Sequence, residues 1–197
     1  MHVDQSYQKL SNRQYVEALL NCSDKKVCTN LAKTMNVTHD SMYRNFKDPI
    51  EQTKNTLEDL KSMAIQNLNL NDLYLIFDDT QITKLYAQEI EGLEVGFDGS
   101  LGMPALGIKM VTALLTDKNI NVPIDAIPYI SKELAQCHYK TKSDIAIEIT
   151  RHIIKLFKIK FVLGDAHYAT HKKIKFLREQ QLQYLMKIPC NRVVTIN

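Results

Sequence analysis

The sequence predicts a mixed α/β domain that follows a helical N-terminal region. Three observations support this class. Residues 1–70 contain no glycine and read as helical, short apolar runs of strand length begin at Leu73, and amphipathic helices separate the later runs. The expected order is helices, strand, hairpin, helix, strand, helix and strand. This order is typical of a mixed sheet with flanking helices.

Short apolar and aromatic runs predict the strands, because buried strands lack a polar face. The strands expected on this basis comprise residues 73–77, 108–115, 120–127, 159–163 and 184–188. Thr116, Asp117, Lys118 and Asn119 separate the second run from the third, and Asp and Asn there favour a tight hairpin turn. The stretch before this hairpin holds five of the six glycines, which predicts a loop or turn region.

Helical spacing identifies residues 141–158 as the clearest helix of the domain. Thr141 or Ser143 can cap it, and Asp144 lies in its first turn, where a negative charge is favourable. Its apolar stripe consists of Ile145, Ile149, Ile153 and Leu156. Residues 170–181 form a second amphipathic helix. In the N-terminal region, Pro49 marks a helix boundary.

Composition and charge narrow the class of protein. The chain has 197 residues and a net charge of +3, but residues 141–197 carry 11 basic and 4 acidic side chains. Residues 71–140 carry 5 basic and 10 acidic side chains. An acidic middle beside a basic last third suggests a metal-binding pocket next to a surface for a polyanion, although ordinary solvated charge would give the same counts. We expect a cytoplasmic protein, since there is no membrane-length apolar run, no secretory signal and no CxxC pair among the four cysteines.

A helix-turn-helix pattern lies within residues 31–46. Ala32 is small enough for two helices to approach, Asn36 can adopt the left-handed conformation of a tight turn, and Thr38 can cap the second helix. The pattern resembles the bacterial helix-turn-helix family, with Asn36 in place of the usual glycine. The second helix would then present Arg44 and Lys47 to a DNA major groove. A helical hairpin without any nucleic-acid role is the alternative.

Two apolar strands are each followed by aspartate. Asp78 and Asp79 end the run at residues 73–77, and Asp165 follows Gly164 at the end of the run at residues 159–163. A carboxylate at the tip of a buried strand is costly unless it is paired, solvated or bound to metal. Two such tips on neighbouring strands would hold hard oxygen ligands for divalent metal ions.

The segment Phe77-Asp78-Asp79-Thr80, followed by Gly164-Asp165-Ala166-His167-Tyr168, resembles the first two sequence blocks of insertion-sequence DDE transposases. The resemblance covers about residues 70–197. It implies a ribonuclease-H-like fold, magnesium as cofactor with manganese as a substitute, and cutting and rejoining of DNA. Asp165 would be the second catalytic and metal-binding carboxylate. The first would be Asp79, which directly precedes Thr80, or its neighbour Asp78, and Asp79 is the preferred assignment.

The resemblance also implies the partners of the protein, and it indicates that one catalytic residue of the family is missing from this chain. Transposon ends and target DNA would be the partners, the full-length protein would form a homo-oligomer, and it would act at the bacterial nucleoid. The family's third carboxylate is a glutamate in a Tyr–Arg–Glu–Lys pattern, whereas this chain offers only Glu179 after Asp165, too near the second block. We therefore expect a helical DNA-binding head at residues 1–70 and a partial catalytic domain at residues 71–197, inactive alone.

Three further residues are candidates for DNA contact. His167 lies beside Asp165, and Lys172 and Lys173 belong to a basic cluster that could contact the DNA backbone. Two other functions remain open. One is a helix-turn-helix DNA-binding module without chemistry. The other is a phosphatase of the haloacid dehalogenase type with Asp78 as nucleophile, although that family requires a second aspartate where this chain has Thr80.

Overall fold

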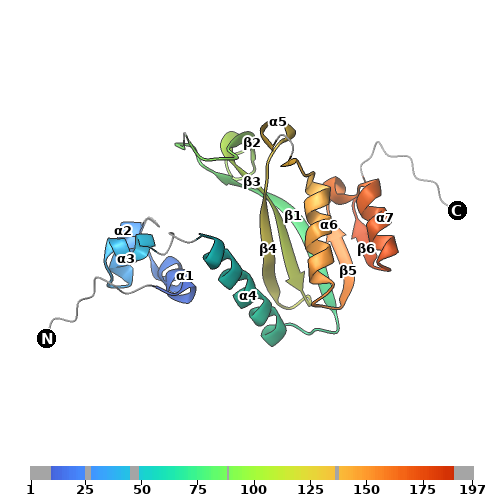
Figure 1. Ribbon diagram of the computed structural model, residues 1–197, viewed down its shortest axis with the longest axis horizontal. Helices are drawn as coiled ribbons and strands as arrows, with labels where there is room; N and C mark the ends of the chain where they lie inside the picture. Colours follow the sequence, from blue (N-terminus) through green and yellow to red (C-terminus); the bar gives the residue numbers. More distant parts are fainter. Residues whose placement is uncertain (1–9, 25–27, 45–48, 88, 136–137, 189–197) are drawn as a thin grey trace. The chain divides into compact units, whose positions relative to one another are not determined.

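The computed structural model of the chain describes residues 10–24, 28–44, 49–87, 89–135 and 138–188. The chain divides into two compact units, Met1–Asp59 and Leu60–Asn197. Figure 1 labels the helices and strands of each unit, in colours that follow the sequence.

Short helices build the first unit. These are α1 (Asn12–Asn21), α2 (Cys28–Thr34) and α3 (His39–Arg44), while α4 (Pro49–Asn67) begins in the first unit and ends in the second. A small apolar core holds the first three helices together, and it consists of Leu10, Ala18, Cys22, Leu31, Ala32 and Met42. Pro49 is the first residue of α4, as expected of proline at a helix start.

The turn between α2 and α3 has the conformation predicted from the sequence. Asn36 has a φ of 52°, in the left-handed region that asparagine tolerates better than most residues. The side-chain oxygen of Thr38 accepts a hydrogen bond from the Ser41 amide at 3.2 Å, which caps α3. Met42 is fully buried. These contacts confirm a helix-turn-helix-like arrangement.

A six-stranded mixed sheet forms the centre of the second unit (Figure 1). Its strands are β1 (Leu73–Thr83), β2 (Glu94–Asp98), β3 (Met103–Thr116), β4 (Asn121–Tyr129), β5 (Ile159–Gly164) and β6 (Gln183–Met186). The order across the sheet is β4, β3, β1, β5, β6, and β2 pairs with the first part of β3. The first three of these strands are antiparallel, and β1, β5 and β6 are parallel. This confirms the predicted ribonuclease-H-like mixed sheet.

Helices flank the sheet. They are α5 (Lys132–Ala135), α6 (Lys142–Ile153), the 3-10 helix η3 (Ala166–Tyr168) and α7 (His171–Glu179). Thr141 and Asp144 form a reciprocal capping box at the start of α6. The core between helices and sheet includes Leu75 and Phe77 of β1 and Ile149 of α6, all nearly inaccessible to solvent. Burial of these apolar side chains is the main force that holds α6 against the strands.

Three predictions about element bounds were wrong. Strand β1 continues past its expected end at Phe77 to Thr83. Helix α6 ends at Ile153, and Leu156 is 49% exposed instead of completing the apolar stripe. The glycine-rich stretch is not only loop, because Gly96 lies in β2 and Gly107 in β3. Cross-strand contacts override the local preference there. The Gln81 side-chain amide donates to the carbonyl oxygens of Ala105 at 2.8 Å and Gly96 at 3.3 Å, across space that a larger residue would fill.

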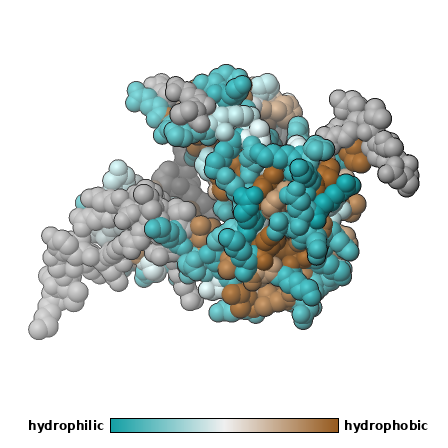
Figure 2. All heavy atoms as spheres, turned by 45° about the vertical axis from the view of Figure 1, so that its right-hand side comes forward, coloured by the Kyte–Doolittle hydropathy of each residue, from teal (hydrophilic) through white to brown (hydrophobic). Residues whose placement is uncertain are grey.

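Figure 2 shows hydrophilic residues over much of the presented face of the second unit, with apolar residues visible between them. Within the part of the chain that the structure describes, no helix is both long enough and apolar enough to cross a bilayer.

Candidate functional site

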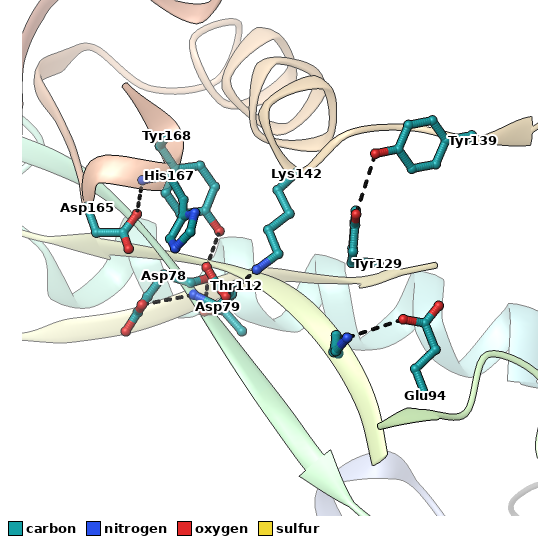
Figure 3. Close-up of polar contacts among 11 residues, drawn as sticks. Asp78, Asp79, Glu94, Thr112, Tyr129, Tyr139, Lys142, Asp165, His167 and Tyr168 are labelled. Atoms are coloured by element: carbon teal, nitrogen blue, oxygen red, sulfur yellow. Dashed lines mark hydrogen bonds and ion pairs between the residues drawn. The ribbon is translucent and has the colours of Figure 1, made fainter. Parts of the chain in front are cut away.

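The parallel pairing of β1 and β5 brings the predicted aspartates together. Phe77 and Gly164 are partners in the register, so Asp78 and Asp165 follow at the same level of two adjacent strands. Asp165 keeps an extended backbone, with φ of −74° and ψ of −173°. Neighbouring strands lie about 4.8 Å apart, so the backbones of the two residues are neighbours. Asp165 directly follows the end of β5, but β1 continues past Asp78 and Asp79 to Thr83, so the expectation that these two aspartates end their strand was wrong. Figure 3 shows Asp165 beside His167, with Asp78 below both.

The side chains of Asp78 and Asp165 each accept one hydrogen bond from a nearby backbone amide. One oxygen of Asp78 accepts the Asp79 amide at 2.9 Å, and one oxygen of Asp165 accepts the His167 amide at 2.9 Å. Both side chains are exposed, and no group among the described residues donates to the second oxygen of either. Each carboxylate is therefore oriented by the backbone and keeps an oxygen available to a ligand.

Asp79, the residue after Asp78, has different hydrogen-bond and ion-pair partners. Side chains alternate along a strand, so Asp79 lies on the face of β1 that carries Phe77, while Asp78 lies on the other. One carboxylate oxygen of Asp79 forms an ion pair with the ammonium of Lys142, and the other accepts the Tyr168 hydroxyl at 3.4 Å (Figure 3). Both oxygens are thus engaged.

Tyr168 connects the three carboxylates. Its side chain is fully buried and its ring packs on Phe77, with the centroids 5.8 Å apart. Burial raises the pKa of the Tyr168 phenol, and the charges of Asp79, Asp165 and Asp78 raise it further. All three carboxylates therefore lie within electrostatic range of one hydroxyl. Gly164 allows this packing, because a Cβ there would lie 3.1 Å from the Cβ of Tyr168.

Lys173 was expected in an exposed basic cluster, and that expectation was wrong. Its side chain is fully buried, with Nζ 3.7 Å from the centroid of the Phe77 ring and 4.8 Å from that of Tyr168. Nζ has no hydrogen-bond partner among the described residues. Burial lowers the pKa of Lys173 to about 7, against the opposing charge of Asp165. The position could have been found from the sequence, because Lys173 precedes the buried Phe176 and Leu177 by three and four residues on α7.

The other basic candidates are exposed. His167 is exposed on η3, beside the carboxylates, and the Lys172 side chain is 72% exposed on α7. Lys172 pairs with Asp144, and this hydrogen bond, with that of Thr141, lowers the pKa of Asp144. Lys142 is a site residue that the sequence analysis missed. A lysine at the first position of a helix carries no pattern that distinguishes it from a solvated one.

The donor set fits a divalent cation in part. Asp78 and Asp165 supply hard oxygen atoms at an exposed position, as magnesium and manganese prefer. Within the described residues, however, no group of three or more His, Cys, Asp or Glu side chains could surround one ion. Glu179 does not join the pair, since it lies in the last turn of α7 with its carboxylate 4.0 Å from Lys175. Water or further ligands would complete the coordination.

The helix α3 carries the predicted DNA contacts of the first unit. His39, Asp40 and Tyr43 are exposed on it, and the rings of His39 and Tyr43 stack with centroids 6.3 Å apart. Arg44 is the last residue of α3, but its side chain lies outside the described part of the structure, as does the whole of Lys47.

Comparison with known proteins gives one family. A sequence model described as DDE superfamily endonuclease matches residues 2–197. No curated protein matches the chain. Among solved structures, the piggyBac transposase synaptic complex with hairpin DNA is 10% identical, with a TM-score of 0.49, over 98% of this chain and 45% of that chain. The Mos1 transposase paired-end complex with the left transposon end is 13% identical, with a TM-score of 0.33, over 91% of this chain and 59% of that chain. The chain thus spans less than two thirds of either.

Proposed function

The chain belongs to the DDE superfamily endonuclease family, and on that premise we propose that it is a transposase of the DDE type, which cuts DNA by metal-dependent phosphodiester chemistry. Family members generally use divalent metal ions, and magnesium is the ion we propose here. The observation that carries the proposal is the pairing of Asp78 with Asp165. Two exposed carboxylates lie on adjacent strands, where the end of β5 meets the middle of β1, and each is oriented by a backbone amide and has an oxygen to spare.

This proposal assigns the first carboxylate to Asp78 in place of the preferred Asp79. A metal ligand needs accessible lone pairs, and both oxygens of Asp79 already accept from Lys142 and Tyr168. Binding of Asp79 to a metal ion would break its ion pair with Lys142 and leave a partly buried ammonium without a counter-charge. This loss adds a free-energy cost to metal binding by Asp79. Asp79 then has a supporting role, in which it positions Lys142 beside the carboxylate cluster of Asp78, Asp79 and Asp165.

The chemistry follows from these roles. When bound, a divalent ion would polarise a phosphodiester and stabilise the charge that develops on its oxygens. Asp78 and Asp165 would hold that ion beside the end of β5. The buried Phe77 and Tyr168 rings cover the interior side of Asp79, so substrate would approach from the exposed side, where Asp78, Asp165 and His167 lie. Attack of a water or 3′-hydroxyl oxygen on phosphorus breaks the bond to the opposite oxygen; the attacking group loses its proton to solvent, and the leaving oxygen takes up a proton from solvent.

DNA recognition by the first unit is the second half of the proposal. The left-handed turn at Asn36 and the cap at Thr38 support placement of α3 in a major groove. Tyr43, 59% exposed, and Arg44 at the end of α3 would contact the DNA, with Lys47 beyond it. Insertion-sequence ends are the substrate we propose.

A DNA-binding module without chemistry is the second candidate. It is favoured by the incomplete ligand set among the described residues, where two carboxylates converge without a third that has free oxygens. It predicts DNA binding that is indifferent to metal ions.

A single set of assays separates these functions. We would measure nicking of supercoiled plasmid by the 197-residue chain with Mg²⁺, with Mn²⁺ and with EDTA, beside the Asp165→Asn variant and an exposed control, Glu148→Gln. Metal-dependent nicking that only Asp165→Asn abolishes would support the endonuclease. DNA binding without any nicking would support the binding module. Nicking that persists in Asp165→Asn would overturn the assignment of the site.

A further inference from the structure

A cavity of about 520 Å³ opens directly beside the carboxylate cluster. Its wall includes Tyr129, Lys142, Asp144, His167, Thr170 and Lys172. Lys142 and His167 line the cavity and also lie beside the carboxylate cluster, since Lys142 pairs with Asp79 and His167 follows Asp165 by two residues. A ligand in this cavity would therefore lie near Asp79 and Asp165.

The wall offers donors to an anion. Lys142 and Lys172 are cationic, and Asp144 is the one carboxylate among the residues that line the cavity. Asp144 is already engaged by Lys172 and by the capping contacts of Thr141. The Tyr129 phenol bonds to the Tyr139 hydroxyl at 3.5 Å, and this contact, with burial, raises the pKa of Tyr129 to about 12. Tyr129 therefore stays neutral and does not repel an anion.

Lys142 is the wall residue with the most restricted position. Its side chain is only 24% exposed, its ammonium is paired with Asp79, and it lies 5.5 Å from the centroid of the Tyr129 ring. A lysine held in this way has lost most of its rotamer freedom before any ligand arrives, so a phosphate contact there costs little further entropy. Hydroxyl groups are available nearby, since the Ser143 and Thr170 hydroxyls lie 2.6 Å apart at the same cavity.

We propose that this cavity is a subsite for a backbone phosphate of the DNA strand, and that Lys142, positioned by Asp79, is the residue that contacts it. The subsite rests on the proposed function in that DNA is taken as the substrate, but it does not require that the chain cut DNA. A phosphodiester fits because it is a compact anion with several acceptor oxygens, which suits ammonium and hydroxyl donors. The size of the cavity leaves room for the attached sugar.

The chain offers a matched control for Lys142. Lys160 likewise pairs with an aspartate, Asp72, at 2.6 Å, and lies 6.0 Å from the centroid of a tyrosine ring, Tyr74. It belongs to β5, near the start of β1 rather than at the carboxylate cluster. Lys142→Gln and Lys160→Gln therefore remove the same kind of ion pair, one with Asp79 inside β1 and the other with Asp72 just before β1.

The test is DNA affinity in EDTA, by fluorescence anisotropy of a labelled duplex and a labelled single strand, over a range of salt concentrations. We expect Lys142→Gln to weaken binding roughly three- to tenfold and to reduce the salt slope by about one phosphate contact. Lys142→Arg should restore most of the affinity, because arginine also binds phosphate. Lys160→Gln should leave both quantities unchanged. Circular dichroism melts of all variants would confirm that each is folded.

Three outcomes would overturn the subsite: equal effects of Lys142→Gln and Lys160→Gln, an unchanged salt slope in Lys142→Gln, or no DNA binding by the chain. Competition with inorganic phosphate and with thymidine monophosphate identifies the source of the ligand. Displacement of DNA from the wild type but not from Lys142→Gln by the mononucleotide would support the phosphate site. Tight mononucleotide binding with unaltered DNA affinity in Lys142→Gln would assign the cavity to free nucleotides and overturn it. If the chain never nicks DNA but Lys142→Gln still weakens DNA binding, the proposed endonuclease activity is refuted and the phosphate subsite is supported.

Discussion

The ammonium of Lys173 lies 3.7 Å from the centroid of the Phe77 ring, inside the unit, with no hydrogen-bond partner among the described residues. The neighbouring carboxylate of Asp165 favours its charged form, but burial outweighs that attraction and lowers the pKa of Lys173 to about 7. A buried amine of this kind is a cost to folding that an apolar side chain would not carry.

The first prediction concerns this lysine and pH. In the unfolded chain the Lys173 pKa returns to its ordinary value of 10.5. Between about pH 7 and pH 10.5 the unfolded chain therefore binds a proton that the folded chain does not, so stability rises with pH in this window. Lys173→Met should remove that rise and be more stable below pH 7, by an amount on the order of 5 kcal/mol at most.

Guanidinium unfolding of wild type and Lys173→Met across this pH range would measure the difference. Lys175→Met, on the same helix but 69% exposed, is the control and should follow the wild type. A difference between wild type and Lys173→Met that stays constant with pH would mean that Lys173 does not titrate in the folded chain.

The second prediction separates the two adjacent aspartates. Asp78→Asn and Asp165→Asn should each weaken Mn²⁺ binding by more than about tenfold, since each removes a charged oxygen ligand. Asp79→Asn should have a smaller effect, because its oxygens already bond to Lys142 and Tyr168. Titrations of Mn²⁺ followed by electron paramagnetic resonance would report affinity without any cleavage assay. The reverse ranking would restore Asp79 as the first ligand.

The third prediction concerns Gly107 in β3. A Cβ at this position would lie 2.7 Å from the backbone oxygen of Ile82, and backbone of a paired strand cannot move aside cheaply. Gly107→Ala should therefore reduce the free energy of unfolding by about 1–3 kcal/mol. Gly99→Ala is the control, since no atom lies within 4 Å of a Cβ there. Equal stability of the two variants in urea would show that β1 and β3 adjust to the methyl group.

The fourth prediction concerns the start of α6, which positions Lys142. The Thr141 hydroxyl oxygen accepts the Asp144 amide at 3.1 Å, and the Asp144 carboxylate accepts the Thr141 amide at 3.1 Å. Thr141→Ala should cost about 1 kcal/mol of stability, whereas Thr141→Ser keeps the hydroxyl and should cost little. Thermal melts by circular dichroism would compare them. A serine variant as unstable as the alanine variant would place the effect in the lost methyl group instead of the cap.

Much of the second unit could be predicted, because its signals are local. Apolar runs marked the positions of β1 and β5, and Asp144 with Thr141 marked the start of α6. The extension of β1 from Phe77 to Thr83 was missed, since this part of the strand is largely exposed and polar, and cross-strand pairing with β3 forms it. Such pairing depends on residues about 30 positions away, which no local pattern reports.

The candidate site was predicted in its carboxylates but not in its surroundings. Asp165 follows from the sequence because β5 ends where its apolar run ends, whereas β1 continues past Asp78 and Asp79 to Thr83. The partners of Asp79 could not be found in the same way. Lys142 and Tyr168 reach it from α6 and η3, at sequence separations of 63 and 89 residues. Only the folded sheet, which fixes where these helices lie, brings these groups together.

The length of β1 has a consequence for how mutations in it would act. The strand has eleven residues, Leu73–Thr83, of which Tyr74–Thr83 pair with β3 on one edge and Leu73–Phe77 with β5 on the other. Because side chains alternate, a shift of this strand by one position would exchange Asp78 and Asp79 between the two faces of the sheet. A single-codon deletion or insertion near residue 77 would thus place each aspartate on the face of the sheet that the other now occupies. A change in the length of this strand would therefore keep both surroundings only in steps of two residues.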